Sequence, residues 1–517
     1  MILLDGASLT LPELEAIADE YAPVSLDPAA ARGVDAARAV VDRYAQGDAP
    51  VYGINTGFGS LAEVKIAKDA LGGLQRNLLR SHAAGVDAPL AERAVRAMMA
   101  LRANVLAKGY SGIRRSTLEL LIAALNARVH PVVPSRGSVG ASGDLAPLAH
   151  LSLVLIGEGR ATVGDDPAVV DGAAALARAG LTPLDLGAKE GLALINGTQA
   201  SAAVAALAVV GAERLARAAD ITAALTIDGL RGSYHPFEAR LHEPRPHPGQ
   251  GRSAANLLAL LQHSPINRSH ENCGRVQDAY SMRCAPQVHG AARDAFSHAR
   301  ATLEIEANAA TDNPMVFADA GGAGDAAGAG AGDIVSGGNF HGAPVAVSAD
   351  LLVLGLLQIG TISERRSDRL VNPVLSGLAP FLTRDSGLHS GYMMAQVTAA
   401  ALVSELKTLA HPASADTIPT SANREDHVSM SMAAALKAER ALALATDVVA
   451  IEMLLACQAI DLLAPLATSP ALAPVHARVR SEVPTLTDDR PPSPDIQMIS
   501  KLITRGTLER ACAIEVK

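Results

Sequence analysis

The chain has 517 residues, with 53 acidic and 44 basic side chains, and its formal net charge is −9 at pH 7. The basic residues form no cluster, which argues against nucleic acid or an anionic membrane as a partner and favours a small soluble substrate. The four cysteines are scattered and include no C-x-x-C pair, so we expect no disulfide framework, no metal site and a location in a reducing cytoplasm.

The composition predicts an all-α fold. Alanine and leucine are abundant, aromatic residues make up 3% of the chain, and long stretches lack the two-residue alternation of strands. Thr10-x-x-Glu13 has the spacing of a capping box, and Asp27-Pro28 reads as an N-cap followed by proline in the first helical position. The first ten residues lack the basic region of a secretory signal, and charges interrupt the apolar runs before about 18 residues, so no membrane span is expected.

A glycine-punctuated loop follows at residues 51–59, with the sequence VYGINTGFG and a single tyrosine, Tyr52. Such a loop is able to close over a substrate. No Gly-Lys-Ser/Thr follows it, so a phosphate-binding loop is not expected. The alternative interpretation is a plain surface turn.

The segment GSVGASGDLAPLAH at residues 137–150 contains Ala141, Ser142 and Gly143, which are able to condense into a methylidene-imidazolone ring. The Gly143 nitrogen would attack the Ala141 carbonyl, and two dehydrations, one of which removes the Ser142 hydroxyl, would complete the ring. Glycine presents an unhindered nitrogen and permits the required bend, and serine carries the oxygen that leaves as water. Ala-Ser-Gly alone occurs by chance in roughly one chain in five of this length, so an ordinary turn is the alternative.

Two later segments place polar groups at predicted helices. Asn196 lies just before a helix, where its carboxamide is able to orient a carboxylate or the ring oxygen, although Asn-Gly is also a common turn. Gln277, Tyr280 and Arg283 are spaced three residues apart, which predicts one shared face if the segment is helical. From such a face, Arg283 is able to bind an α-carboxylate through two parallel hydrogen bonds, with a solvated helix face as the alternative.

The longest helices are expected in the second part of the chain. The stretches 200–219, 344–362 and 441–463 are apolar around most of their circumference, which predicts helices buried on most faces of a multi-helix bundle. The Gly- and Ala-rich run at 318–332 is expected to be a flexible surface loop inserted in the fold.

No low-complexity linker divides the chain into independent blocks, so we expect one catalytic unit over residues 1–517. Within it, we expect an N-terminal region at 1–195 with the loop and the Ala-Ser-Gly segment, a long-helix bundle at 196–485, and a C-terminal segment at 486–517.

Segment 137–150 resembles the signature of the aromatic amino acid ammonia-lyase family, and further matches follow in the family's order from Tyr52 to Met430. These matches include Asp312-Asn313-Pro314, Ser336–His341, Ser363–Arg366, His411–Ser414 and Ser421–Met430. The resemblance implies a helical-bundle fold of the ammonia-lyase and aspartase–fumarase type, and a methylidene-imidazolone formed from the chain itself without an external cofactor. It also implies an amino acid substrate and a homotetramer whose active sites are built by more than one subunit.

The resemblance assigns roles to the residues that match the family's motifs. Ser142 and Tyr52 would act in catalysis, with Tyr52 as the base for the β-proton, and catalytic Tyr280 would lie near the imidazolone. Arg283 would bind the α-carboxylate, and Phe340 would form a wall of the pocket, with a core aromatic as its alternative. The full set of implied substrate-binding residues is His82, Asn196, Gln277, Arg283, Phe340 and Glu425.

Two positions favour histidine as the substrate. Ser81-His82 resembles the histidine-specific members of the family, and His82 is able to hydrogen-bond an imidazole nitrogen, which a phenyl ring lacks. Glu425 suits an imidazole and would be an unpaired buried charge against a phenyl ring. Two residues depart from the family's pattern: Arg424 stands where a glutamine is usual, and Ala279 replaces a usual proline. An ion pair between Arg424 and Glu425 would weaken Glu425 as a ligand of the substrate.

The sequence therefore predicts elimination of ammonia from L-histidine to give trans-urocanate. One alternative is a tyrosine or phenylalanine lyase or aminomutase on the same scaffold. A second is a helical scaffold protein without activity. A third is a lyase of the aspartase–fumarase type, which would not need the Ala141–Gly143 segment.

Overall fold

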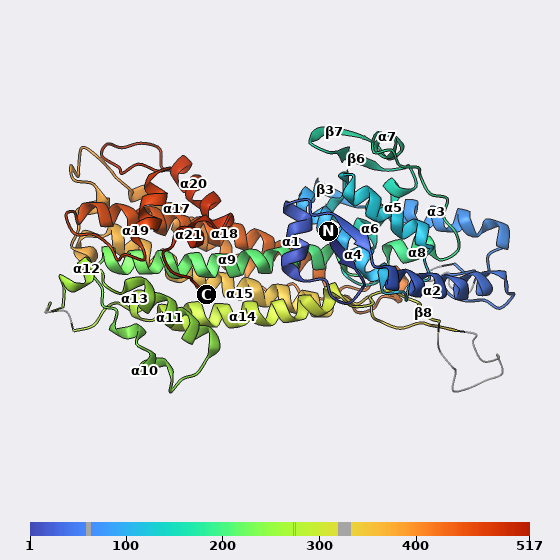
Figure 1. Cartoon of the computed structure of the whole chain (residues 1–517), viewed down its shortest axis with the longest axis horizontal. Helices are drawn as coiled ribbons and strands as arrows, with labels where there is room; N and C mark the ends of the chain where they lie inside the picture. Colours follow the sequence, from blue (N-terminus) through green and yellow to red (C-terminus); the bar gives the residue numbers. More distant parts are fainter. Residues whose placement is uncertain (58–63, 272, 275, 319–331) are drawn as a thin grey trace. The chain divides into compact units, whose positions relative to one another are not determined.

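The structure is a computed structural model that describes residues 1–57, 64–271, 273–274, 276–318 and 332–517 (Figure 1). Helices dominate these residues, and the strands among them contain only three to six residues each. The predicted all-α class is therefore confirmed. Phe58 and Gly59 of the glycine-punctuated loop, and most of the run at 318–332, lie outside the described residues.

The chain forms two compact units, each assembled from separate stretches of sequence. The first unit contains residues 1–207, 300–349 and 412–436, and the second contains 208–299, 350–411 and 437–517. Four of the five boundaries fall within long helices, α9 (Gln199–Gly229), α14 (Ala285–Ala307), α15 (Ala343–Val371) and α18 (Ser431–Leu462), and the fifth, at 411/412, follows α17 (Met393–Leu409). The three consecutive regions expected from the sequence follow chain order, whereas the compact units combine distant segments.

Two helices of the first unit begin at the caps that the sequence predicted. Thr10 precedes α1 (Leu11–Asp19); its hydroxyl accepts from the Glu13 N–H at 3.3 Å, and the Glu13 carboxylate accepts from the Thr10 N–H at 2.9 Å. Asp27 precedes α2 (Pro28–Gln46), and its carboxylate accepts from two backbone N–H groups of the first turn. These bonds satisfy donors that have no partner within the helix and so fix where each helix begins.

Helix α4 (Glu92–Ala107) forms the centre of the first unit, because every residue from Ala94 to Ala107 is buried. It packs against α1, α2 and α5 (Arg115–Asn126). Its buried polar side chains, Arg96, Arg102 and Asn104, are hydrogen-bonded to carbonyl groups of other segments, which offsets the cost of removing them from water.

A second helical group of this unit positions the Ala-Ser-Gly segment. Helices α3 (Leu71–His82), α6 (Leu145–Leu155) and α8 (Glu190–Ile195) pack against one another in pairs (Figure 1). The remaining elements of the first unit are β1 (Ile2–Leu4), β2 (Val24–Leu26), η2 (Lys68–Ala70), β3 (Val86–Pro89), β4 (Val129–Pro131), β5 (Pro134–Arg136), β6 (Arg160–Val163), β7 (Asp166–Asp171), α7 (Gly172–Arg178), β8 (Met315–Phe317), β9 (Asp333–Val335) and η5 (Ser421–Asn423).

The strands form small separate sheets. Strands β1 and β2 pair in parallel, and β3–β5, β4–β6–β7 and β8–β9 pair antiparallel. Sheets this small cannot bury a core of their own, so they act as connections between helices.

The second unit is also helical. Its elements are η3 (His235–Phe237), α10 (Ala239–His242), α11 (Pro248–Leu261), α12 (Pro265–Arg268), α13 (Tyr280–Arg283), α16 (Pro373–Ser376), η4 (Pro380–Leu382), α17 (Met393–Leu409), α19 (Ala473–Arg480), α20 (Ser493–Thr504) and α21 (Thr507–Ala511).

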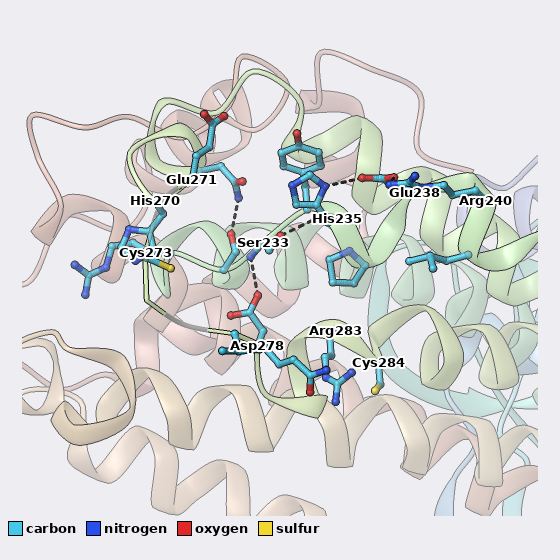
Figure 2. A pocket seen from close by; sticks show the side chains of 18 of the residues that line it. Ser233, His235, Glu238, Arg240, His270, Glu271, Cys273, Asp278, Arg283 and Cys284 are labelled. Carbon is cyan, nitrogen blue, oxygen red and sulfur yellow. Dashed lines mark hydrogen bonds and ion pairs between the residues drawn. The ribbon is translucent and has the colours of Figure 1, made fainter.

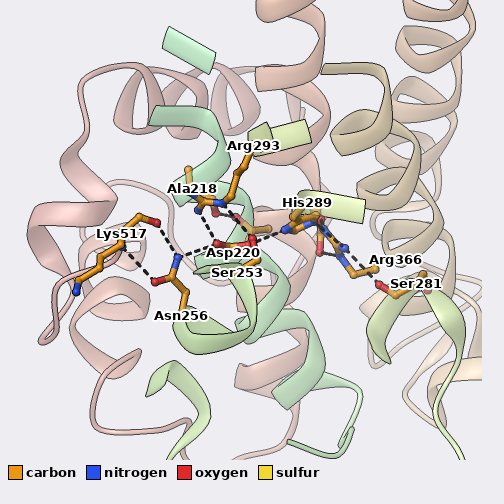
Figure 3. Close-up of polar contacts among 11 residues, drawn as sticks. Ala218, Asp220, Ser253, Asn256, Ser281, His289, Arg293, Arg366 and Lys517 are labelled. Carbon is orange, nitrogen blue, oxygen red and sulfur yellow. Dashed lines mark hydrogen bonds and ion pairs between the residues drawn. The ribbon is translucent and has the colours of Figure 1, made fainter. Parts of the chain in front are cut away.

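A buried polar network connects helices of the second unit (Figure 3). The Asp220 carboxylate accepts from His289 Nδ1 at 2.7 Å, from Arg293 at 2.6 Å and from Asn256 Nδ2 at 2.9 Å. Although burial opposes ionisation, Arg293 and His289 lower the pKa of Asp220 to about 2. The network therefore holds a charged carboxylate in the core by surrounding it with donors.

The same unit contains a buried ion pair from the Ser363–Arg366 match. Arg366 donates to Glu452 at 2.8 Å, and both side chains are fully buried. Thr226 donates to the same carboxylate at 2.7 Å. Two charges removed from water in this way depend on each other, because either one alone would be uncompensated.

Helices α15 and α18 are long and apolar enough to cross a membrane by composition alone. However, 67% and 89% of their most apolar windows, respectively, are buried inside the protein. Burial of this extent is typical of core helices, which agrees with the long apolar helices that the sequence predicted at 344–362 and 441–463.

Candidate active site

The Ala141–Gly143 segment lies between β5 and the start of α6, with Ala141 and Gly143 buried and Ser142 half-buried. Gly143 has a φ of +74°, and a Cβ at this position would lie 2.3 Å from the carbonyl oxygen of Gly197. Both the conformation and the close approach therefore require glycine here.

The Ser142 side chain and carbonyl have separate polar partners. The Ser142 hydroxyl donates to Glu425 Oε1 at 2.7 Å, and the Ser142 carbonyl accepts from Asn196 Nδ2 at 3.1 Å. The second carboxylate oxygen of Glu425 accepts from the Thr420 hydroxyl at 2.6 Å. Backbone bonds between Thr420 and Glu425 close the same turn, so the carboxylate is held toward Ser142 from two directions.

Asp144 is a buried residue of this site that the sequence reasoning missed. Its carboxylate accepts from the Ser138 hydroxyl and from the Ser201 N–H and hydroxyl, each at 2.7 Å. Burial raises the pKa of Asp144, and these hydrogen bonds oppose the rise. Its backbone N–H donates to the Gly197 carbonyl at 2.7 Å, so Asp144 joins the start of α6 to the Asn196–Gly197 turn. Its position directly before a helix was the signal available in the sequence.

Arg102 of α4 supports the Asn196 turn from behind and was also missed. It donates to the Asn196 carbonyl at 2.8 Å, to Gln199 Oε1 at 2.6 Å and to the Ala193 carbonyl at 2.6 Å. Complete burial lowers the pKa of Arg102 to about 10. Sequence alone gives no signal for this role, because the partners lie more than 90 residues away along the chain.

A buried ion pair lies beside this support. Lys189 donates to Asp312 Oδ2 at 3.2 Å and to the Ser111 carbonyl at 2.9 Å, and both members of the pair are almost fully buried. Burial lowers the pKa of Lys189, and Asp312 opposes this effect. Asp312 belongs to the Asp312-Asn313-Pro314 match, so this motif contributes to the frame around the site.

The predicted lid residue Tyr52 lies half-buried in a turn of the first unit. The neighbouring Gly53 has a φ of +77°, and a Cβ there would lie 2.6 Å from the Leu192 side chain. The turn therefore packs directly against Leu192 of α8, which lies four residues before Asn196 along the chain.

His82 is the last residue of α3, and its ring is fixed by the helix. His82 Nδ1 lies 2.9 Å from the Leu78 carbonyl and 3.0 Å from the Ser81 hydroxyl. A carbonyl only accepts hydrogen bonds, so Nδ1 is the donor in this contact.

Phe340 lies half-buried in the loop between β9 and α15.

Gln277, Tyr280 and Arg283 belong to the second unit, whereas the residues around Ser142 belong to the first. A shared face was expected if the segment is helical, and this condition is not met, because α13 contains only Tyr280–Arg283 and Gln277 precedes it outside a helix. The physical reason is the neighbouring Asp278, whose carboxylate accepts from the Ser233 N–H at 2.7 Å and holds this stretch outside a helix.

Arg283 and Gln277 line a cavity of about 740 Å³ in the second unit (Figure 2). The Arg283 guanidinium lies 4.7 Å from the centre of the Tyr280 ring, within the range of a cation–π contact. Arg283 Nε is buried and has no hydrogen-bond partner among the described residues. An orphaned donor of this kind is available to an anionic ligand.

Arg424 does not pair with Glu425 in the part of the chain that the structure describes, although the two residues are neighbours in sequence. The Arg424 side chain is exposed. The Glu425 carboxylate therefore faces Ser142 rather than its neighbour in sequence.

The chain is similar to known proteins over nearly its whole length. The sequence model of the aromatic amino acid lyases matches residues 9–481. Histidine ammonia-lyase of Anaeromyxobacter dehalogenans is 55% identical over 515 residues, covering 98% of this chain and 99% of that relative. The crystal structure of histidine ammonia-lyase from Trypanosoma cruzi is 44% identical with a TM-score of 0.91, covering 99% of this chain and 94% of that one. Tyrosine aminomutase from Streptomyces globisporus is 38% identical with a TM-score of 0.92, covering 100% of both chains. The chain therefore belongs to the aromatic amino acid lyase family.

Proposed function

We propose that this protein is a carbon–nitrogen lyase that eliminates ammonia from L-histidine to give trans-urocanate. The observation that carries the proposal is the Ser142 residue itself, whose hydroxyl is bonded to Glu425 and whose carbonyl is bonded to Asn196. The high identity to histidine ammonia-lyases over nearly the whole chain supports the same activity.

We propose that Ala141, Ser142 and Gly143 form a methylidene-imidazolone. Two observations support the fit: Gly143 N–H donates no hydrogen bond to any described residue, and the Ser142 carbonyl, which would become the ring oxygen, already has a donor in Asn196. This group, once formed, supplies an electrophilic carbon that makes ammonia a better leaving group. Asn196 would stabilise negative charge on the ring oxygen because its amide is fixed in place before the reaction.

The substrate-binding residues that we propose in the first unit suit an imidazole substrate. Because Nδ1 of His82 donates to the Leu78 carbonyl, Nε2 is the ring nitrogen that remains for the substrate, and it would form a hydrogen bond with a substrate imidazole nitrogen. Glu425 would provide a second polar partner for the same ring, and Phe340 a wall of the pocket. Tyr52 would remove the β-proton as the general base.

The second unit would supply the groups that hold the amino acid end of the substrate. Arg283, with its orphaned Nε, would bind the α-carboxylate, and Gln277 and Tyr280 would lie beside it. We propose a homotetramer in which more than one copy contributes to each site, and a cytoplasmic location.

The similarity to tyrosine aminomutase makes that activity the second candidate. An aminomutase moves the amino group and releases no ammonia, whereas a lyase releases one ammonia for each unsaturated acid. Purified protein incubated with L-histidine is expected to produce ammonia and urocanate in equal amounts. A β-amino acid as the main product, or ammonia only from tyrosine, would overturn the proposal.

A further inference from the structure

Two segments far along the chain hold the backbone just before Ala141. The Gly140 carbonyl accepts from the Ser429 hydroxyl at 2.9 Å and from the Gly342 N–H at 3.3 Å. The Val139 carbonyl accepts from the Met430 N–H at 2.8 Å. These three bonds attach residues 139–140 to the start of α18 and to the loop before α15.

The packing at this attachment is as close as glycine allows. Gly140 has a φ of +65°, and a Cβ there would lie 2.3 Å from the hydroxyl oxygens of both Ser429 and Ser431. A Cβ on Gly342 would lie 2.5 Å from the Ser431 hydroxyl. The Gly140 peptide therefore has little freedom to move toward either serine.

The other end of the Ala-Ser-Gly segment is held equally closely. The Asp144 N–H donates to the Gly197 carbonyl, and Gly143 packs directly on the Gly197 backbone. The two anchored ends leave the Gly143 nitrogen, which has no hydrogen bond among the described residues, between them. Cyclisation requires this nitrogen to approach the Ala141 carbonyl carbon, so fixed ends shorten the search for a reactive geometry.

We propose that Ser429 is a positioning residue for the self-processing of Ala141–Gly143, acting through the Gly140 carbonyl. This inference rests on the proposed function. In the first step, the Gly143 nitrogen bonds to the Ala141 carbonyl carbon, and the carbonyl oxygen leaves as water with the protons of the Gly143 and Ser142 amides. In the second, the Ser142 hydroxyl leaves as water with the Cα proton, so no oxidant or reductant is needed.

The Ser429 hydrogen bond matters because it orients the peptide that carries Ala141 into the ring closure. Loss of one hydrogen bond that holds this peptide in place is expected to change the rate of closure by roughly two- to tenfold. Ser431 provides a matched comparison, since its hydroxyl is buried at the same attachment but has no hydrogen-bond partner among the described residues.

The test follows the intact mass of full-length protein at intervals after cell-free synthesis. The wild-type chain is expected to lose the mass of two water molecules. Ser429→Ala is expected to lengthen the half-time of that loss by roughly two- to tenfold, and Ser429→Cys, whose thiol is a weaker donor, by an intermediate amount. Ser431→Ala is expected to keep the wild-type half-time. Thermal unfolding of each variant checks that it folds, and Ser429→Cys carries the test if Ser429→Ala does not fold.

Two results would overturn the inference while leaving the proposed function intact. One is a wild-type half-time in the Ser429 variants. The other is an equal delay in Ser431→Ala, which would assign the effect to packing rather than to the hydrogen bond. Failure of the wild-type chain to lose any water would instead overturn the proposed imidazolone, and the inference with it.

Discussion

The hydroxyl of Ser142 lies 2.7 Å from a carboxylate oxygen of Glu425, although 283 residues separate the two along the chain. A short turn maintains this contact, because Thr420 binds the other carboxylate oxygen and pairs with Glu425 through the backbone. The same part of the chain continues to Ser429, which holds the Gly140 carbonyl. One segment therefore contacts both the side chain of Ser142 and the backbone that precedes it.

Replacement of Glu425 by glutamine should impair turnover of histidine. The substitution keeps the size of the side chain but removes a charge worth about 1.5–3 kcal/mol in a hydrogen bond, so kcat/KM should fall about ten- to hundredfold. Steady-state kinetics with L-histidine measure this effect. Glu243→Gln, on an exposed part of the second unit, is the matched control. A kcat/KM within twofold of wild type in Glu425→Gln would rule out contact between this carboxylate and the substrate.

Loss of the Asn196 amide should slow the chemical step. Asn196→Ala removes the donor to the Ser142 carbonyl, and removal of one such fixed donor costs about a hundred- to thousandfold in kcat. The intact mass establishes whether the variant has lost two waters, and the unfolding midpoint establishes that it folds. If a processed, folded variant retains the wild-type kcat, Asn196 does not stabilise charge on the ring oxygen.

The buried Arg366–Glu452 ion pair should contribute to the free energy of unfolding. Arg366→Met leaves Glu452 as an uncompensated buried charge, so the free energy of unfolding should fall by about 3–5 kcal/mol. Arg478→Met is the control, because Arg478 forms a partly exposed pair with Glu482 that is worth at most about 1 kcal/mol. Denaturant unfolding of both variants makes the comparison, and equal losses would contradict it.

His130 should make the fold sensitive to acid. It is 3% exposed, and burial lowers its pKa from 6.5 to about 4. The unfolded chain therefore binds the proton first, so this contribution to stability is complete above about pH 6.5 and is lost as the pH falls toward 4. The shift corresponds to about 3 kcal/mol.

In His130→Gln, the free energy of unfolding should depend less steeply on pH between 4 and 6.5. Unfolding curves at several pH values in this range provide the measurement. An unchanged slope in the variant would show that His130 does not titrate differently in the folded and unfolded chains.

The sequence was informative about helices but less so about their ends. The predicted stretch at 200–219 is part of α9, which continues to Gly229. Asp220 directly follows the predicted apolar stretch, and Asp228 lies further along the same helix. The structure buries both carboxylates and pairs them with donors such as His289, so polar residues continue a core helix here.

The site could be predicted only where its residues belong to recognisable motifs. Ser142, Asn196 and Glu425 were predicted, and the structure brings them together. Arg102 was not predicted, because a buried arginine in an apolar helix acquires its role from carbonyls far away in sequence. Gln277 was placed on a helix by its spacing, whereas the tertiary contact of its neighbour Asp278 keeps it outside one.

The most direct test of the account is the near-ultraviolet absorbance of purified protein supplied separately with L-histidine, L-tyrosine and L-phenylalanine. The absence of tryptophan keeps the protein background low. We predict growth of a urocanate band with histidine alone, and no band in Ser142→Ala. A cinnamate or coumarate band without urocanate, or an undiminished urocanate band in Ser142→Ala, would contradict the account.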